Sequence, residues 1–264
     1  MADGRYAVSL IAPLAVLGRA DEVALRVDQA IQLGLLAHGE QLPPEAEFAA
    51  QLGVSAMTLR EALAVLRQQG LVETRRGRTG GTFVRRPTAP KLGLLRDRLR
   101  AMTAGELRDL ADEQSAVSGA AARLAATRAS TVSVRRLLAL ADQLAASPTT
   151  GARIMADGRF HVEVAIASKS QRLTALEVAL QAKLTELLWL PATADEEAAG
   201  AAERSGLASP PASLEAAAAA GEHAAIAAAI AAEAGPRARL LAEEHAEANL
   251  RRLTALRLAL PPQP

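Results

Sequence analysis

The chain has 264 residues, a formal net charge of +1 at pH 7 and 50% hydrophobic residues. This length allows two domains of ordinary size, each with a core of its own. Because the sequence contains no Cys, it excludes disulfide bonds, iron–sulfur clusters and thiolate zinc sites, so any metal must be bound by His and carboxylates. The lack of Cys also fits the reducing cytoplasm, where we expect the protein to act.

Residues 1–18 are an N-terminal extension, and its apolar stretch from Tyr6 to Leu17 resembles the core of a signal peptide. One Arg close to Asp3 flanks this stretch and a folded domain follows, so we expect a strand or helix that packs on that domain. The Ala-rich run 216–232 lacks the large aliphatic residues of a membrane span and contains Glu222 and His223. We therefore predict neither a membrane-spanning segment nor a membrane partner.

Three helices are predicted at the start of the first domain, at 19–36, 45–52 and 56–69. The first shows apolar residues every four positions, at Val23, Val27, Ile31 and Leu35. Gly53 ends the second helix, where a residue free to adopt positive φ is favoured, and Ser55 is placed to cap the third. The apolar stripe of the third helix consists of Leu59, Leu63 and Leu66, and Gly70 ends it.

Two helices joined by a short turn that contains Gly predict a helix-turn-helix. The second helix of this motif enters the major groove of DNA with its N-terminal residues towards the bases. The residues at this reading end are Ser55, Met57, Thr58 and Arg60.

Segments 71–76 and 82–86 are rich in β-favouring residues and are separated by the sequence GRTGG, which predicts a hairpin, the wing. From Arg60 to Arg86 the chain carries seven basic and two acidic residues, a local net charge of +5, against +1 for the whole chain. This local positive charge favours contact with DNA phosphates. The predicted contacts from the hairpin are Arg75, Arg76, Arg78 and Gly80.

The segment LGVSAMTLREALAVLRQQGLVETRRGRTGGTFV resembles the winged helix-turn-helix of the GntR family of bacterial transcription regulators along its whole length. The family commonly has two arginines that this chain lacks, at the positions of Ala46 and Ala56. Arg is the residue that makes a bidentate contact with guanine. The operator sequence of the relatives therefore cannot be transferred to this chain.

Beyond the wing, Pro87 and Pro90 prevent the strand from continuing, and helical spacing runs almost without interruption from Lys91 onward. We predict helices at 92–102, 104–129, 132–146, 150–167, 170–189, 212–233 and 236–258. The fold class is mainly α, with a winged helix-turn-helix domain at 19–87, a linker with the first bundle helix at 88–103, and an all-α bundle at 104–260. The segments GAAARLAATRAS, DGRFHVEVAIAS, GEHAAIAAAI and EEHAEANLRRL resemble, in this order, the FCD effector domain of the FadR-like branch of the GntR family.

Asp157 and His161 lie four residues apart, which places them on one face of a helix. His223 and His245 would be about 33 Å apart on one continuous helix, but a reversal at Gly235-Pro236 brings them to nearly the same level. One site with three His and one Asp can then form, and this ligand set suits a divalent transition metal such as Zn, Ni or Mn. The alternative is that the three His residues are buried and satisfied by backbone or carboxylate neighbours. FCD domains often carry this combination of residues.

The resemblance also implies a small-molecule effector near the metal. Relatives tend to have an Arg in the second bundle helix that pairs with an effector carboxylate, and an Asn after the helix that carries the Asp and His ligands. This chain has Gln114 and Ser118 in the first region and Ser170 in the second. These three are the candidate effector-binding residues, and we expect a small organic acid although a fixed positive charge is missing.

These observations predict a homodimeric transcriptional regulator that acts as a repressor. It binds double-stranded operator DNA and responds to a small organic acid at a metal-containing pocket. One alternative is a metal-dependent, hydrolase-like enzyme, since a metal with an open position can activate water. No general base or oxyanion donor can be named beside the predicted ligands, so we expect no catalytic residues. A second alternative is a DNA-binding protein without an effector.

Overall fold

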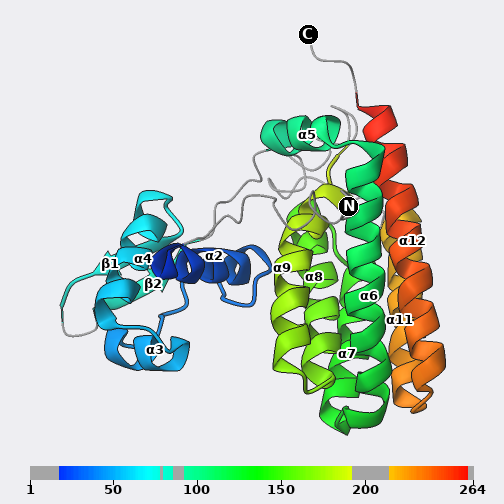
Figure 1. The fold of residues 1–264 in the computed structure, drawn as a ribbon, viewed down its shortest axis with the longest axis horizontal. Helices are drawn as coiled ribbons and strands as arrows, with labels where there is room; N and C mark the ends of the chain where they lie inside the picture. The colour runs from blue at the N-terminus through cyan, green and yellow to red at the C-terminus, as the bar shows by residue number, and fades with distance from the viewer. Residues whose placement is uncertain (1–17, 78–79, 86–91, 192–213, 261–264) are drawn as a thin grey trace, which may run out of the picture. The chain divides into compact units, whose positions relative to one another are not determined.

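The computed structural model describes residues 18–77, 80–85, 92–191 and 214–260. The predictions for the N-terminal extension and for Arg78 therefore lie outside the described residues. The chain forms two compact units: the first contains residues up to 28 together with 38–85, and the second contains 29–37 and the residues from 86 onward. The mainly α fold class is confirmed, since every described element is a helix except for one two-stranded hairpin (Figure 1).

The first elements are α2 (Arg19–Gln32), α3 (Glu45–Leu52), α4 (Ala56–Gln68), β1 (Val72–Arg75) and β2 (Gly81–Val84). Helix α2 ends four residues before the predicted end at 36. Gly34 has a φ of 65°, in the left-handed region, and this conformation does not continue an α-helix. The four-residue spacing of apolar residues, which continues to Leu35, could not reveal this change of backbone direction.

The turn and the cap of the helix-turn-helix are confirmed. Gly53 ends α3 with a φ of 67°, and its N–H donates to carbonyl groups of that helix. The Ser55 hydroxyl accepts a hydrogen bond from the Thr58 N–H at 3.1 Å, which caps α4. The predicted apolar stripe of Leu59, Leu63 and Leu66 is buried. The sequence of α3 and α4 thus determines where each helix ends and which face of α4 remains accessible.

The wing is an antiparallel hairpin of β1 and β2, in which Val72 lies opposite Val84 and Arg75 lies opposite Gly81. Val72 and Val84 are buried, whereas Thr74 and Arg75 are exposed. One face of the hairpin therefore joins the core of the first unit, and the outer end carries charged side chains.

The second unit contains the helices α5 (Leu92–Ala101), α6 (Ala104–Arg128), α7 (Thr131–Ala145), α8 (Thr150–Ala167), α9 (Gln171–Leu188), α11 (Leu214–Ala231) and α12 (Gly235–Ala259). Several helices start at a residue whose side-chain hydroxyl caps the first turn. Thr103, for example, forms a capping box with Glu106 at the start of α6. Pro236 lies in the first turn of α12. Helices α11 and α12 pack against each other, so the predicted chain reversal between them is confirmed (Figure 1).

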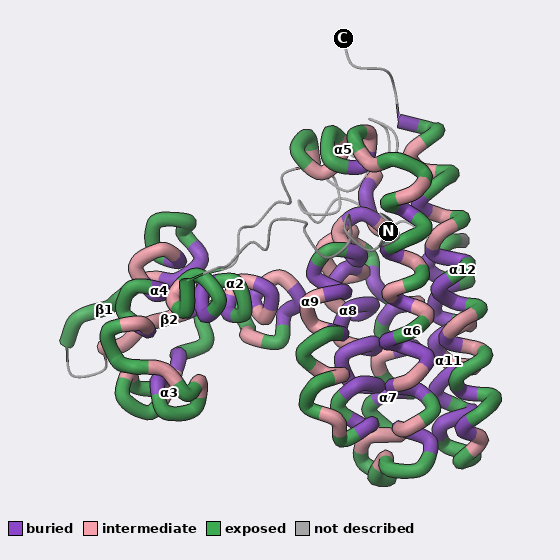
Figure 2. The backbone as a smooth tube through the Cα atoms, viewed as in Figure 1, coloured by how far each residue is buried: buried purple, intermediate pink, exposed green. Residues whose placement is uncertain are grey.

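The bundle core combines a cluster rich in Ala, where small side chains let helices approach closely, with a second cluster made almost entirely of Leu. Helix α6 packs along α12, and α7 packs against α8 and α11. The largest shared cluster includes many Ala side chains around the fully buried Phe160. Figure 2 shows that the buried positions line the inner faces of the bundle helices. Among the described helices, none has both the length and the hydropathy needed to span a bilayer.

Candidate metal centre and nucleic-acid interface

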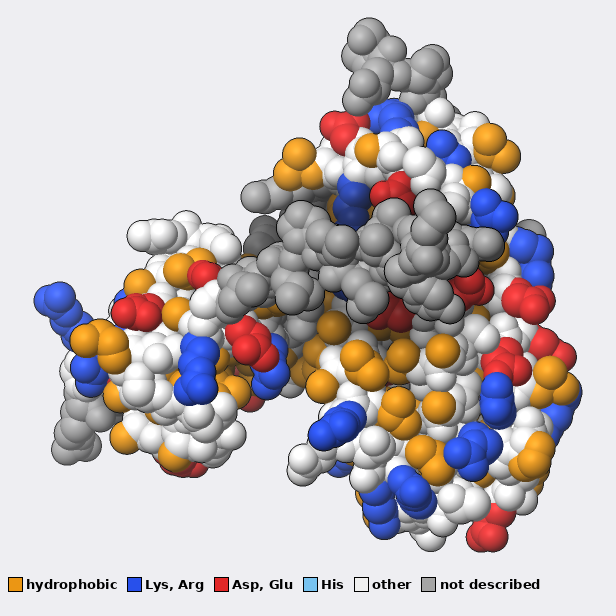
Figure 3. All heavy atoms as spheres, in the orientation of Figure 1, with side chains coloured by type: hydrophobic (Ala, Val, Ile, Leu, Met, Phe, Trp, Pro, Cys, Tyr) orange, Lys and Arg blue, Asp and Glu red, His pale blue; other side chains and the backbone are white. Residues whose placement is uncertain are grey.

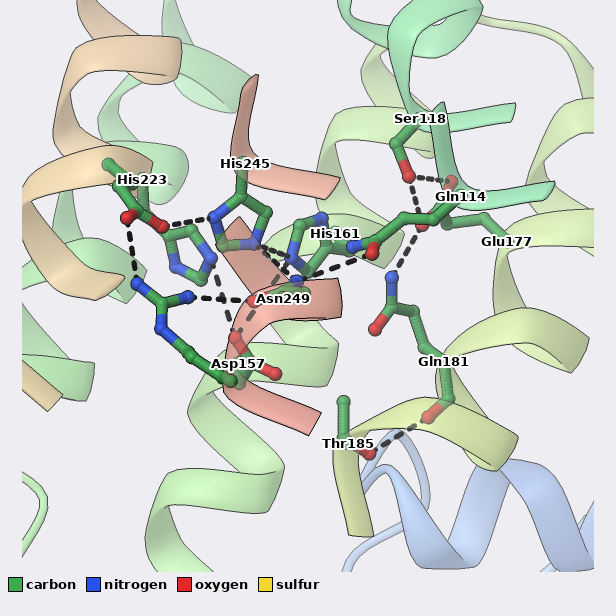
Figure 4. Close-up of polar contacts among 12 residues, drawn as sticks. Gln114, Ser118, Asp157, His161, Glu177, Gln181, Thr185, His223, His245 and Asn249 are labelled. Carbon is green, nitrogen blue, oxygen red and sulfur yellow. Dashed lines mark hydrogen bonds and ion pairs between the residues drawn. The ribbon is translucent and has the colours of Figure 1, made fainter. Parts of the chain in front are cut away.

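Four predicted metal ligands meet inside the bundle, from three helices. Asp157 and His161 come from α8, His223 from α11 and His245 from α12. Each offers one ligand atom, and these atoms all lie within 4.8 Å of one another. All four side chains are buried (Figure 4). The predicted convergence of these residues is therefore confirmed, and they form the four-residue cluster.

The tautomer of His245 follows from its neighbours. Arg252 donates to Asn249 Oδ1 and to Glu222 Oε1, both at 2.7 Å. Because a guanidinium group can only donate, the Asn249 oxygen is the acceptor and its amide nitrogen faces His245 Nε2 at 3.0 Å. That nitrogen donates, so Nε2 carries a lone pair, and the ring proton lies on Nδ1, which donates to Glu222 Oε2 at 2.6 Å. Glu222 and Arg252 thus hold His245 in the form that can bind a metal.

Three further buried polar atoms of the four-residue cluster have no hydrogen-bond partner, two on His223 and one on Asp157. His223 Nε2 lies 3.4 Å from Asp157 Oδ1 without the geometry of a hydrogen bond, and neither ring nitrogen of His223 has a partner. Asp157 Oδ2 also has no partner. His161 Nε2 and His245 Nε2 are 3.2 Å apart. Buried polar atoms usually have partners, and a cation at this point would bind one nitrogen of each ring and a carboxylate oxygen of Asp157. The donor set therefore fits a divalent transition metal.

Burial also sets the protonation states in the cluster. It holds the pKa of His161 and of His223 well below the ordinary 6.5, so both rings are neutral, which is the form that binds metal. Burial raises the pKa of the Asp157 carboxyl to about 6. For Glu222, burial acts in the same direction, but the hydrogen bond from His245 and the charge of Arg252 outweigh it and keep the pKa below its ordinary value. Glu222 is therefore the ionised carboxylate that orients His245.

The predicted DNA-reading residues lie at the start of α4. Met57 is 66% exposed and Ser55 and Arg60 are exposed. Thr58 is half-buried and its hydroxyl lies 2.9 Å from that of Ser55, so it takes part in the helix cap. Arg60 forms an ion pair with Glu45 of α3 at 2.8 Å. The contacts of these residues with bases stay predictions. To reach a base, the Arg60 guanidinium must break its ion pair with Glu45 or bind the base and Glu45 at the same time.

The wing presents further basic groups. Arg75 pairs with Glu73 at 2.6 Å and lies over the Phe83 ring, 4.4 Å from its centroid. Arg76 is exposed and Gly80 is half-buried. Figure 3 shows basic side chains, all of them Arg in this unit, projecting at the hairpin end of the first unit. This surface is suited to phosphate contact, and the roles of these residues towards DNA stay predictions.

The candidate effector residues occupy different environments. Gln114 and Ser118 are buried on one face of α6, and the Ser118 hydroxyl donates to Glu177 at 2.9 Å. Ser170 instead caps α9 by accepting from the Leu173 N–H, so its hydroxyl already has a structural role. The effector-binding roles of all three remain predictions.

Sequence reasoning missed five polar residues around the four-residue cluster. All five are buried or partly buried, and each forms a hydrogen bond to a predicted site residue or to another member of the group. They are Glu177, Gln181, Glu222, Asn249 and Arg252. The sequence does contain one signal, because Glu177 and Gln181 lie four residues apart on a helix whose neighbouring positions are apolar.

The family comparisons agree with this architecture. Residues 19–84 match the family described as "Bacterial regulatory proteins, gntR family", and residues 109–248, more than half of the chain, match the FCD domain. The HTH-type transcriptional regulator RmpR of Mycobacterium gastri is 45% identical over 178 residues, which are 67% of this chain and 65% of RmpR. The Uxu operon transcriptional regulator of Escherichia coli K12 is 35% identical over 52% of this chain and 54% of its own.

Among solved structures, E. coli McbR/YncC is similar with a TM-score of 0.48 and 16% identity, over 91% of this chain and 99% of that one. The chain thus spans between half and two thirds of the length of the two curated relatives named above. The FCD match includes all four residues of the buried cluster, and the GntR match covers the winged helix-turn-helix. Together these matches show that the chain belongs to the GntR family, with an FCD domain, and is a transcriptional regulator and not an enzyme.

Proposed function

We propose that this regulator binds its operator as a homodimer and represses transcription, and that a small organic acid at a metal ion in the bundle controls DNA binding. The observation that carries the proposal is the convergence of four buried ligand atoms within 4.8 Å. The proposed place of action is the cytoplasm, where bacterial DNA lies. The FadR-like branch is the subfamily that this combination suggests.

The metal would be held by Asp157, His161, His223 and His245, with Zn, Ni or Mn as the candidate ions. Four protein ligands leave positions for effector oxygens on an ion of higher coordination number. Because the ligands come from α8, α11 and α12, the ion would join three helices, and effector binding could shift their equilibrium positions. The free energy of effector binding would in this way be coupled to DNA binding.

The DNA-binding proposal assigns the bases to the start of α4 and the phosphates to the wing. A single head offers few base contacts, so a unique site requires two heads on a pseudo-palindrome. Selection of duplexes from a random pool with the full-length protein should return a site with two-fold symmetry. A single half-site, bound as tightly as the symmetric site, would contradict the proposed dimer.

Exposed apolar surface on the bundle supports the homodimer. Ile166 of α8 and Leu176 of α9 are 48% and 49% exposed. Figure 3 shows hydrophobic side chains gathered over the bundle face that α8 and α9 form. Oligomeric proteins commonly bury such surfaces in a two-fold interface. Sedimentation at micromolar concentration should give a dimer, and a monomer that retains tight operator binding would contradict it.

The regulatory experiment uses the selected operator and purified protein in metal-loaded and metal-free forms. We expect a small organic acid to change the operator affinity of the metal-loaded protein and to have no effect on the metal-free protein. An equal response of both forms would contradict metal-dependent control. A promoter–reporter fusion then gives the sign of regulation, which is informative because a 36% identical relative is named Glc operon transcriptional activator.

A further inference from the structure

A layer of buried polar side chains lies next to the four-residue cluster and is explained by neither the metal ligands nor the helix packing. On α6 it contains Gln114 and Ser118, four residues apart, and on α9 it contains Glu177 and Gln181, also four residues apart. These side chains are between 0% and 4% exposed. We call these four residues the polar subsite. Residues at this spacing share a helix face, so two polar faces meet inside the bundle.

The polar subsite is connected to the proposed metal centre. Asn249, whose amide nitrogen contacts His245, also donates to Gln114 Oε1 at 3.3 Å. Helices α6 and α9 run antiparallel, since the apolar cluster of Leu107 and Leu110 at the beginning of α6 includes Leu184 and Leu187 at the end of α9. In Figure 4 the amide of Gln114 lies between Glu177 and the histidines, and the amide of Gln181 meets Glu177 from below.

The orientation of each amide follows from one fixed group. Arg252 makes Asn249 Oδ1 an acceptor, so Asn249 donates to Gln114 Oε1, which leaves Gln114 Nε2 without a partner. Gln181 Nε2 donates to Glu177 Oε1 at 2.8 Å, which leaves Gln181 Oε1 without a partner. A donor and an acceptor are thus unsatisfied in the interior, which is costly unless a further molecule pairs with them.

Glu177 sets the charge of the polar subsite. It accepts hydrogen bonds from Ser118 and Gln181, and no cationic side chain of the described residues forms an ion pair with it. Burial raises the pKa of this carboxyl to about 7. A carboxylate from a ligand would meet a second acid and the Gln181 carbonyl oxygen, whereas a hydroxyl or ammonium group would donate to both of them.

We propose that Glu177 and Gln181 bind the end of the effector that is remote from the metal, and that this end is a hydrogen-bond donor, a hydroxyl or ammonium group, and not a second carboxylate. A hydroxyl group, unlike an ammonium group, would also accept from Gln114 Nε2. This inference rests on the proposed function, in which an acid group of the effector binds the metal. Glu177 is then the residue that determines specificity, because it rejects dicarboxylates.

Four probes of similar size test this proposal: butyrate, γ-hydroxybutyrate, γ-aminobutyrate and succinate. All carry one carboxylate for the metal, and their far ends are methyl, hydroxyl, ammonium and carboxylate. Calorimetric titration of the full-length, Zn²⁺-loaded protein should give γ-hydroxybutyrate or γ-aminobutyrate an affinity at least about tenfold above butyrate and succinate, since hydrogen bonds to a charged group have this magnitude. The comparison of the hydroxyl with the ammonium probe identifies the donor.

Glu177→Gln is the decisive variant, because its side chain has the same shape and can still accept from Ser118 and Gln181. It should reduce the preference over succinate by about tenfold, since repulsion between two carboxylates is removed. Glu113→Gln is the matched control, because Glu113 lies on α6 and pairs with Lys183 at 3.9 Å, with its side chain 39% exposed. It should leave the preference unchanged.

Tight binding of succinate, an unchanged preference in Glu177→Gln, or no binding of any probe at millimolar concentration to metal-loaded protein would overturn the inference. The metal content of each sample is measured in parallel by elemental analysis. Protein that takes up no metal would contradict the proposed function itself, whereas metal-loaded protein without the expected preference would contradict only the assignment of the polar subsite.

Discussion

Replacing Glu177 by Gln should change the stability of the bundle in a pH-dependent way. Burial raises the pKa of this carboxyl from 4.5 to about 7, so the folded protein keeps the proton over a range in which the unfolded chain has lost it. The folded state binds more protons there, and the stability contributed by the neutral carboxyl is lost as pH rises towards about 7. Above that pH the ionised carboxylate lowers the free energy of unfolding by roughly 3 kcal/mol at most.

The measurement is urea unfolding of the wild type and of Glu177→Gln, at one pH near 5 and one near 8, values that bracket most of this window. Trp189, the single tryptophan of the chain, packs at the end of α9 and reports unfolding of the bundle by fluorescence. We expect the free energy of unfolding of the variant, relative to wild type, to increase by about 2–3 kcal/mol from the lower to the higher pH. Other titrating groups are common to both proteins and cancel. A difference that does not depend on pH would refute the reasoning.

Three further predictions concern the reading head and the proposed metal centre. Arg60→Ala should weaken binding to the selected operator more than to random duplex DNA in an anisotropy titration, because its position favours base contact; equal weakening on both DNAs would reassign it. Arg76→Ala should make the salt dependence of log K shallower by about 0.9 for each phosphate that is no longer neutralised, and an unchanged slope would show that Arg76 does not bind phosphate. Glu222→Gln should lower metal affinity by about ten- to hundredfold in a chelator competition, because His245 loses the carboxylate that orients it; unaltered affinity would show that Glu222 has no such role.

The parts of the fold that depend on local chemistry could be predicted from the sequence. Ser55 caps α4, Gly53 ends α3 and Pro236 starts α12, because caps and chain reversals depend on residues within one turn of the helix end. The end of α2 was predicted too late, since the apolar period does not show that Gly34 adopts a left-handed conformation.

The candidate metal ligands could also be found, because Asp157 and His161 are neighbours on one helix and a Gly-Pro reversal relates the other two. In the polar subsite, the family resemblance points to Gln114 and Ser118, but the contacts of these two residues could not be predicted, because they join residues far apart in the sequence. Ser118 and Glu177 are 59 positions apart, and Asn249 and Gln114 are 135 apart. The sequence shows that Glu177 and Gln181 lie four residues apart among apolar positions, but only the packing of α9 against α6 shows that they are buried.

The metal content of purified protein tests the central claim most directly. Protein prepared without chelator should contain about one transition-metal ion per chain by elemental analysis, as expected for one site of four ligands. His223→Ala should lose the ion and His38→Ala, a His outside the four-residue cluster, should retain it. Wild-type protein that contains no metal and whose thermal midpoint does not move on addition of Zn²⁺, Ni²⁺ or Mn²⁺ would contradict the claim, and the three histidines would then be buried residues of the bundle core.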